Sequence, residues 1–167
     1  MQIININGPI NSGKSTISKL LEKELPNALF IEVDDLLSDE EQEKLGLKME
    51  QGWQERTNRL TKIVNAEKQN KAYDNIVFAY PISENLYNEW KLWQDENTKF
   101  INITLAPKLE VCLTNRGTRE LEEAEKHRIV QMYEEGYHNR AYSDLIIDNS
   151  VQTPSETLDT ILKFLRK

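Results

Sequence analysis

The sequence has little of what a secreted, disulfide-bonded or membrane protein needs. Cys112 is the only cysteine, so no internal disulfide can form. No apolar run approaches the roughly 18 residues that a membrane span requires. The amino terminus enters an apolar strand at once, so we expect no secretory peptide before it. These absences predict a cytoplasmic protein with no membrane contact.

Positive charge is also scarce. The chain has 21 lysines and arginines against 28 aspartates and glutamates, which gives a formal net charge of −7. Such a surface repels nucleic acid, so the composition argues against nucleic acid as a partner, although a local basic cleft remains compatible with it. With 167 residues, 38% of them hydrophobic and 29% charged, the chain suits one domain, residues 1–167, with well-solvated helices.

What the chain does have is a phosphate-binding pattern at residues 8–15, which match G-x-x-x-x-G-K-[ST] at every position. Glycines in this pattern let the backbone curl around an anion, so that amide N–H groups point at the β-phosphate. Lys14 is expected to reach the β- and γ-phosphates, and the Ser15 hydroxyl to bind Mg²⁺. The residues predicted to hold a nucleoside triphosphate are Gly8, Asn11, Ser12, Gly13, Lys14, Ser15 and Thr16.

The surroundings of this loop favour a real phosphate site over a chance match. Residues 1–6 form a short apolar strand that runs straight into the loop. Beyond the loop, leucines and isoleucines from Ile17 to Leu25 recur at helical spacing, and Pro26 ends the helix. The positive end of that helix would then face the phosphates.

Strands and helices alternate along the rest of the chain. Further strands are expected at 28–33, 75–80, 100–105 and 144–147, and helices at about 40–71, 84–93, after Pro107, at about 119–135 and from Pro154. Thr153-Pro154-Ser155-Glu156 reads as a capping box at the start of the final helix. This order predicts an α/β fold, with a five-stranded parallel sheet covered by helices on both faces. In such folds the ligand crevice lies at the carboxyl ends of the strands.

Two aspartates follow the second expected strand. Asp34 would lie across the cleft from the loop, where it could bind an acceptor hydroxyl as general base or ligate Mg²⁺ through water. Asp35 is a second candidate for substrate binding, although its side chain should point elsewhere. The alternative is that the pair only caps the following helix.

Two arginine pairs are further candidates. Arg116 and Arg119 flank a glycine between two helices, and this suits a lid over the phosphates, at about residues 115–138. The alternative is an ordinary surface turn. Arg56 and Arg59 lie across the expected acceptor cleft, and Arg59 in particular could hold an anionic substrate, although nothing in the spacing demands it.

Other residue types carry weaker signals. Asn149 follows the last strand, in a loop that could touch a nucleobase. Asp148 fits a magnesium-binding strand pattern, but we favour a simple strand end. His127 and His138 lack metal-ligand spacing and are expected at the surface. Cys112 and the tryptophans Trp53, Trp90 and Trp93 are expected in the core. The alternative for the tryptophans is a substrate platform, since Trp53 lies in the acceptor region.

On these residues the chain resembles the small P-loop kinases, which include nucleoside-monophosphate, shikimate, gluconate and chloramphenicol kinases. The resemblance covers essentially the whole chain, though only the phosphate loop is specific. Asn7 to Ser15, followed by Phe30 to Asp34, looks most like the chloramphenicol phosphotransferase branch, which implies that Asp34 is the base. The resemblance also implies a three-layer P-loop NTPase fold with a helical lid. It implies ATP and Mg²⁺ as cofactors and transfer of the γ-phosphate to a hydroxyl of a small metabolite or antibiotic.

The stretch from Leu105 to Arg119 is similar to the strand, helix and lid of shikimate- and gluconate-type kinases. This likeness implies that Arg116 stacks on adenine, that Arg119 meets the phosphates as a catalytic residue, and that the loop from Asn149 contacts adenine. Two departures leave the acceptor open. The third strand ends in Tyr80-Pro81 without a glycine-rich turn, and the lid lacks an arginine-proline-leucine-leucine run.

Three other functions share part of this pattern. A GTP-hydrolysing switch needs an Asp-x-x-Gly element, which is absent, and an Asn-Lys-x-Asp guanine reader, which residues 70–74 miss by one place. A polynucleotide 5′-kinase shares the loop and the acid but needs a basic channel, which the acidic composition disfavours. A nucleotide-binding module without catalysis remains the alternative if Asp34 does not face the cleft.

Overall fold

The computed structural model describes residues 1–115 and 120–166, and in this part of the chain five strands form one parallel sheet. The strands are β1 (Gln2–Asn7), β2 (Ala28–Ile31), β3 (Asn75–Ala79), β4 (Lys99–Leu105) and β5 (Leu145–Ile147). Their order in the sheet is β2-β3-β1-β4-β5, with every neighbouring pair parallel. The predicted five-stranded parallel sheet is therefore confirmed.

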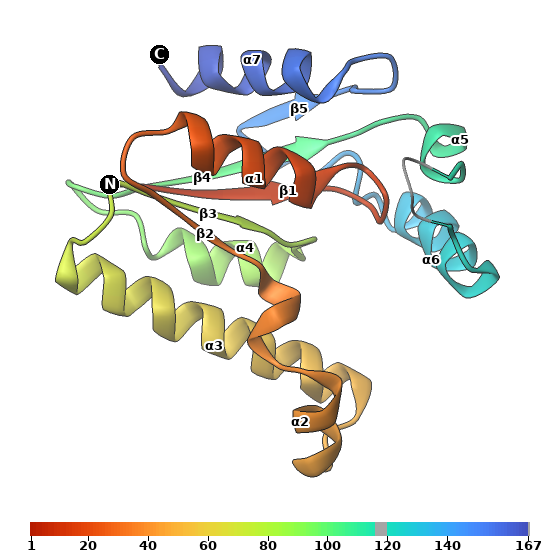
Figure 1. Cartoon of the computed structure of the whole chain (residues 1–167), viewed down its shortest axis with the longest axis horizontal. Coiled ribbons are helices and arrows are strands. Elements are labelled where there is room, and N and C mark those ends of the chain that lie inside the picture. Colours follow the sequence, from red (N-terminus) through yellow and green to blue (C-terminus); the bar gives the residue numbers. More distant parts are fainter. Residues whose placement is uncertain (116–119, 167) are drawn as a thin grey trace.

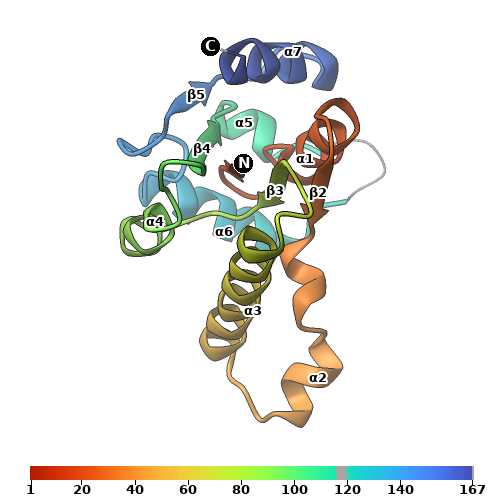
Figure 2. The ribbon, with the colours of Figure 1, turned by 90° about the vertical axis from the view of Figure 1, so that its left-hand side faces the viewer.

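Helices cover both faces of this sheet. They are α1 (Lys14–Glu24), the 3₁₀ helix η1 (Val33–Leu36), α2 (Asp39–Lys44), α3 (Met49–Asn70), α4 (Glu84–Lys91), α5 (Leu109–Cys112), α6 (Glu123–Glu134) and α7 (Pro154–Leu165). Figure 1 shows α1 and α7 on one face and α3 and α4 on the other, with α5 and α6 beyond the carboxyl ends of the strands. This is the three-layer arrangement that was predicted. In Figure 2, α2 and the start of α3 extend away from the sheet as an arm.

The alternation of side chains along each strand separates two apolar cores. Ile4 and Ile6 on β1 pack with Leu21 of α1 and Ile161 of α7. Ile3, one position earlier, belongs to the core of the opposite face, which is shared by β3, α3 and α4. Because successive strand residues point to opposite faces, one central strand supplies both cores.

The α3/α4 face becomes polar toward the carboxyl ends of the central strands. Asn5 and Asn7 of β1 lie beside Asn102 and Thr104 of β4, and all four side chains are fully buried. Asn5 Nδ2 donates to Asn102 Oδ1 (2.9 Å), and Asn7 Nδ2 donates to Thr104 Oγ1 (2.8 Å). Buried polar groups persist where they are hydrogen-bonded, so this face forms a connected network rather than a defect.

The same network fixes the chain that follows β3. The main-chain N–H of Tyr80 donates to Asn5 Oδ1, and the Tyr80 carbonyl oxygen accepts from Asn5 Nδ2, both at 3.0 Å. The N–H of Ile82 donates to Asn7 Oδ1 at 3.2 Å. The segment Tyr80–Ile82, at the ligand edge of the sheet, is therefore held by side chains of the central strand.

Two predicted elements differ from the structure. The second strand ends at Ile31 rather than Val33, and the aspartates lie on η1. The helix predicted over 40–71 is two helices, because Gly46 takes a left-handed conformation (φ 65°) that ends α2. The predicted capping box is confirmed: Thr153 Oγ1 accepts from the N–H of Glu156, and Glu156 accepts from the N–H of Thr153.

The predicted burial of single residues has a mixed outcome. Trp90, Trp93 and Cys112 are buried, as predicted, but Trp53 is 42% exposed, so its assignment to the core was wrong. His127 is exposed, whereas His138 is half-buried with its ring stacked on Tyr133 at 4.7 Å. The structure therefore corrects the expectation of a surface position for His138. In the described part of the chain, no helix is long and apolar enough to cross a bilayer.

Candidate active site

A cleft of about 720 Å³ lies at the carboxyl edge of the sheet. Its walls come from the phosphate loop and α1 (Ile10, Asn11, Gly13, Lys14, Ser15, Thr16), the chain after β2 (Glu32, Asp34), α3 (Trp53), the end of β3 (Ala79, Tyr80, Pro81) and the loop after β5 (Asn149). The sequence motif and the candidate acid therefore share one cavity, where parallel α/β sheets place their ligands.

Two glycines give the phosphate loop its path. Gly8 has φ 142°, and a Cβ there would lie 2.5 Å from the Leu105 carbonyl oxygen, so only glycine fits between β1 and β4. Gly13 has φ 97° and begins α1 without a side-chain cap. The first amide N–H groups of α1 are therefore left for a ligand, which is the usual arrangement at a phosphate-binding helix.

Lys14 lines the cleft and closes the loop on itself. Its Nζ atom donates to the carbonyl oxygen of Pro9 at 2.7 Å. The ammonium group thus lies within the ring of loop residues that the motif assigns to the phosphates.

The loop after β5 contacts the phosphate loop through Asn149. Its Nδ2 atom donates to the Ser12 carbonyl oxygen at 3.0 Å. Its Oδ1 atom and the Ser12 hydroxyl are both buried and have no hydrogen-bond partner within residues 1–115 and 120–166. Buried acceptors are rarely left unpaired, so Asn149 Oδ1 is available to a donor on a bound molecule.

Two carboxylates from the chain after β2 reach the cleft. Asp34 lines the cleft, as does Glu32, which the sequence analysis did not consider. Burial raises the pKa of the Glu32 carboxyl and the nearby Asp34 raises it further, while Lys19 and a hydrogen bond from Ser15 oppose the rise. Glu32 could have been found from its place at the end of the expected second strand, because the ligand crevice of a parallel sheet lies at the carboxyl ends of the strands.

These side chains can contribute to a magnesium site but do not form one alone. No three His, Cys, Asp or Glu side chains gather into a metal site anywhere in the described ranges. Mg²⁺ in proteins is commonly held by one or two carboxylates together with substrate phosphates and water. Ser15, with Glu32 beside it, fits that incomplete kind of site.

A second hollow of about 370 Å³ adjoins the cleft. Asp34 and Trp53 line both cavities, and the remaining walls of the second are Leu37, Ser38, Asp39 and Arg56. Asp34 therefore lies where the cleft adjoins the second hollow, which is large enough for part of a small molecule.

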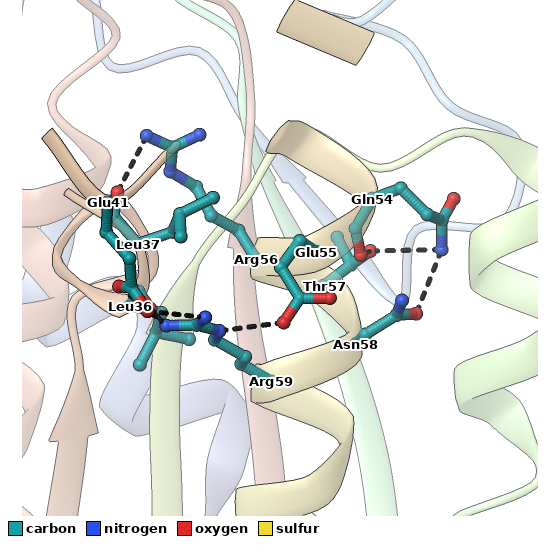
Figure 3. Close-up of polar contacts among 9 residues, drawn as sticks. All are labelled: Leu36, Leu37, Glu41, Gln54, Glu55, Arg56, Thr57, Asn58 and Arg59. Carbon is teal, nitrogen blue, oxygen red and sulfur yellow. Dashed lines mark hydrogen bonds and ion pairs between the residues drawn. The ribbon is translucent and has the colours of Figure 1, made fainter. Parts of the chain in front are cut away.

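Arg59 was predicted to bind substrate, but in the structure it lines neither cavity. Its guanidinium donates to the Leu36 carbonyl oxygen (2.8 Å) and pairs with the carboxylates of Glu41 and Glu55 (Figure 3). Arg59 lowers the pKa of both carboxyls through these hydrogen bonds. These contacts fasten η1 and α2 to α3.

Arg56 makes a parallel set of contacts one turn earlier on α3. It donates to the Leu37 carbonyl oxygen at 2.8 Å and to Gln42 Oε1 at 3.0 Å. Gly52 makes room for Gln42, since a Cβ at Gly52 would lie 2.1 Å from the same Oε1 atom. Arg56 is almost fully buried yet borders the second hollow, so it fixes that wall.

The remaining predicted residues are distributed as follows. Asp35 is exposed and lines neither cavity, and Gly8 and Ser12 are buried within the loop rather than on the cleft wall. Arg116 and Arg119, predicted for the lid, lie outside the described residues. The structure thus brings Lys14, Ser15, Asp34 and Asn149 together and leaves Asp35 and Arg59 apart.

Comparison with known proteins agrees with this geometry. Residues 4–158 match the protein-family model described as an AAA domain. No curated protein sequence matches the chain significantly.

Several solved structures share the fold across nearly the whole chain. A gluconokinase from Sinorhizobium meliloti 1021 superposes with a TM-score of 0.68 at 15% identity, covering 99% of this chain and 91% of the gluconokinase. A shikimate kinase from Bacteroides thetaiotaomicron gives 0.66 at 15% identity, covering 99% and 98%. A deoxyadenosine kinase from M. mycoides with bound dATP gives 0.57 at 19% identity, covering 100% of both chains. At these identities the likeness shows the fold alone.

Proposed function

Because the chain belongs to the AAA-domain family and has the fold of small P-loop kinases, we propose that it is an ATP- and Mg²⁺-dependent phosphotransferase. It would move the γ-phosphate of ATP to a hydroxyl of a small molecule, in the cytoplasm. The observation that carries this proposal is that Lys14, Ser15 and Asp34 line the same cleft. Phosphoryl transfer needs little more from a protein than positioning and charge stabilisation.

The loop side of the cleft supplies the nucleotide site. The amide N–H groups at the start of α1 bind the phosphate oxygens, and Lys14 exchanges the Pro9 carbonyl oxygen for the β- and γ-phosphates. Asn149 Oδ1 is buried and has no hydrogen-bond partner among the described residues. It suits an amino group on the base and so favours ATP over GTP, whose base carries a carbonyl at the corresponding place.

The carboxylate side supplies the acceptor chemistry. Asp34 accepts a hydrogen bond from the acceptor hydroxyl and aims its oxygen at the γ-phosphorus. It takes the hydroxyl proton as the acceptor oxygen bonds to the γ-phosphorus, while the bond from that phosphorus to the bridging oxygen breaks and ADP leaves. Ser15 and Glu32, which line the same cleft, would hold Mg²⁺. When bound, the ion neutralises charge on the β- and γ-phosphates.

The proposed function also includes a lid over the nucleotide. Residues of about 115–138 would close over the phosphates and exclude water, with Arg116 against the adenine and Arg119 at the transferring group. The single-domain organisation of residues 1–167 is part of the same proposal.

The experiment is to titrate the full-length chain with ATP and with GTP, each with Mg²⁺, by calorimetry. ADP formation is then followed with and without added alcohols. We expect ATP to bind more tightly than GTP, and an alcohol acceptor to accelerate ADP release over the slow loss of phosphate to water. Absence of ATP uptake in the presence of Mg²⁺ would overturn the proposal.

A further inference from the structure

One large aromatic side chain is exposed inside the cleft. Trp53, on α3, is 42% exposed, whereas Trp90 and Trp93 are 0% and 5% exposed. Trp53 lines both the 720 Å³ cleft and the adjoining 370 Å³ hollow. An indole left in contact with water inside a cavity, rather than packed in the core, indicates a ligand surface.

Tyr80 forms a second aromatic wall next to it. The ring centroids of Trp53 and Tyr80 are 6.2 Å apart with an angle of 58° between the rings, so the two side chains form a tilted aromatic pair. Tyr80 also lines the cleft. Since Asn5 fixes the Tyr80 main chain through two hydrogen bonds, this wall is held in place by the central strand.

Trp53 is also fixed. The guanidinium carbon of Arg56 lies 5.0 Å from the centroid of its ring, within the range of a cation–π contact. Arg56 is itself only 7% exposed and is hydrogen-bonded to the Leu37 carbonyl oxygen and to Gln42. The indole therefore has one neighbour that holds it, and it remains open to the cavities that Asp34 lines.

We propose that Trp53 and Tyr80 form the acceptor platform, and that the acceptor is an uncharged alcohol with a planar aromatic or heteroaromatic ring. This rests on the proposed function, since Asp34 must receive the hydroxyl. The ring lies against Trp53, and the hydroxyl extends along the shared edge of the two cavities to Asp34.

The charge of the cleft decides against an anionic acceptor. Glu32 and Asp34 line the cleft, and Asp39 lines the adjoining hollow. Of the cations there, Lys14 belongs to the phosphate loop, and Arg56 already donates to protein oxygens. A sugar acid would place its carboxylate among carboxylates, which is unfavourable at close range.

The apolar character of the platform decides against an open-chain polyol. The indole face itself offers no hydrogen-bond partner, so only those hydroxyls of a polyol that reach Asp34, Ser38 or Asp39 would keep one. A flat ring instead stacks on the indole and loses little conformational freedom on binding. Two kinds of compound carry the required ring and hydroxyl, namely nucleosides and phenyl-bearing alcohols.

Intrinsic fluorescence offers a direct test, because Trp53 is exposed while Trp90 and Trp93 lie in the core. The full-length chain is saturated with ADP and Mg²⁺, so that the loop side is filled, and is then titrated with adenosine, thymidine, 1-phenyl-1,2-ethanediol, gluconate or shikimate. We expect at least one ring-bearing alcohol to quench the fluorescence, and the two acids to leave it unchanged. The ring that gives the stronger quenching, nucleobase or phenyl, then identifies whether the acceptor is a nucleoside or a phenyl-bearing alcohol.

Variants separate the platform from general damage. Trp53→Ala should weaken the binding of the ring alcohol, followed by calorimetry, about 10-fold or more, and Trp53→Phe should keep it within about threefold, as expected for stacking. Neither change should alter ATP affinity. Leu92→Ala removes an apolar side chain that is 82% exposed and lines neither cavity, and it should leave both affinities unchanged.

The outcomes distinguish this inference from the kinase proposal. Phosphorylation of gluconate or shikimate at equal rates in wild type and Trp53→Ala would overturn the platform and leave a kinase. Fluorescence that responds to none of the ring alcohols would also overturn it. If ATP fails to bind, the proposed function is wrong. Titration of the nucleotide-free chain with the ring alcohols would still show whether Trp53 and Tyr80 bind them.

Discussion

Lys14 and Pro9 are joined across the phosphate loop by a hydrogen bond of 2.7 Å from the ammonium group to the main-chain carbonyl oxygen. The lysine is thus already directed into the loop before any phosphate arrives. When phosphate binds, Lys14 exchanges the Pro9 oxygen for phosphate oxygens. Its long side chain therefore loses little conformational freedom on binding.

From this contact we predict that Lys14→Ala lowers turnover about 100- to 1000-fold, the scale of losing one preorganised group that stabilises transition-state charge. The thermal unfolding midpoint should stay close to that of wild type, because the side chain lies on the cleft wall. Lys23→Ala, at an exposed position on the same helix, is the matched control and should keep full activity. Wild-type turnover in Lys14→Ala would contradict the assignment.

Asp34 and Asp35 provide a natural comparison, because both are exposed and adjacent but only Asp34 lines the cavities. Asp34→Asn should reduce turnover about 100-fold or more with little change in ATP affinity, as expected for loss of a general base. Asp35→Asn should behave as wild type in the same steady-state assay. Equal losses of turnover in both variants would contradict a general base at Asp34 and favour a helix-capping role for both aspartates.

Glu32→Gln should change stability and activity in opposite directions. Because burial and Asp34 raise the pKa of Glu32, the folded protein holds this proton more tightly than the unfolded chain does. The resulting stabilisation is present below the unfolded value of 4.5 and is lost as the pH rises through the folded pKa.

The amide cannot ionise, so the gain in unfolding midpoint should be larger at pH 8 than at pH 4. It should be only about 1–2 °C, since Glu32 is partly exposed and roughly 1 kcal/mol corresponds to 2–4 °C at this size. Turnover should meanwhile need more Mg²⁺. Thermal scans across pH, together with a magnesium titration, measure both effects. A midpoint that falls at pH 8 would contradict the burial argument.

Asn7→Ala should destabilise the chain by about 2–3 kcal/mol. The substitution leaves the Ile82 N–H and the Thr104 hydroxyl, both bonded to Asn7, without that partner in a buried setting. Urea unfolding measures the loss, and Asn97→Ala, in the exposed turn before β4, is the control. Because Ile82 follows the wall formed by Tyr80, the Michaelis constant for the acceptor should rise as well. A loss below about 0.5 kcal/mol, the range of ordinary surface substitutions, would show that this network does not stabilise the fold.

Thr153→Ala should cost about 1 kcal/mol by removing the capping box of α7. The unfolding midpoint should fall by roughly 2–4 °C. Thr160→Ala, in the middle of the same helix, should leave the midpoint unchanged or slightly higher, since alanine favours helix. Equal effects of the two substitutions would show that the cap is not what stabilises this terminus.

The parts of the fold that could be predicted from sequence are those set by local chemistry. The loop at Gly8 to Ser15 follows from a local motif whose two glycines take positive φ angles, and the parallel sheet follows from strands that alternate with helices. Thr153 and Glu156 cap each other within four residues, so no knowledge of distant contacts was needed to predict α7.

What could not be predicted depends on residues far apart in the chain. The exposure of Trp53 follows from its place over Tyr80 and Arg56, which no helical periodicity encodes. Glu32 was missed because the second strand was extended to Val33, and its position beside Ser15 arises only when β2 and α1 are brought together. Gly46, by contrast, was a local signal for the break after α2 that the helical pattern around it concealed.

Asn11, at the tip of the phosphate loop, has a left-handed backbone, and its side chain donates to the carbonyl oxygens of Cys112 and Thr114 at 2.9 Å each. The chain segment that leads toward the predicted lid is therefore tied to the same few residues that would grip the nucleotide. A movement of the loop on binding phosphate would therefore also displace the main chain at Cys112 and Thr114 through these two hydrogen bonds. Nucleotide binding would thus be coupled directly to the start of the predicted lid.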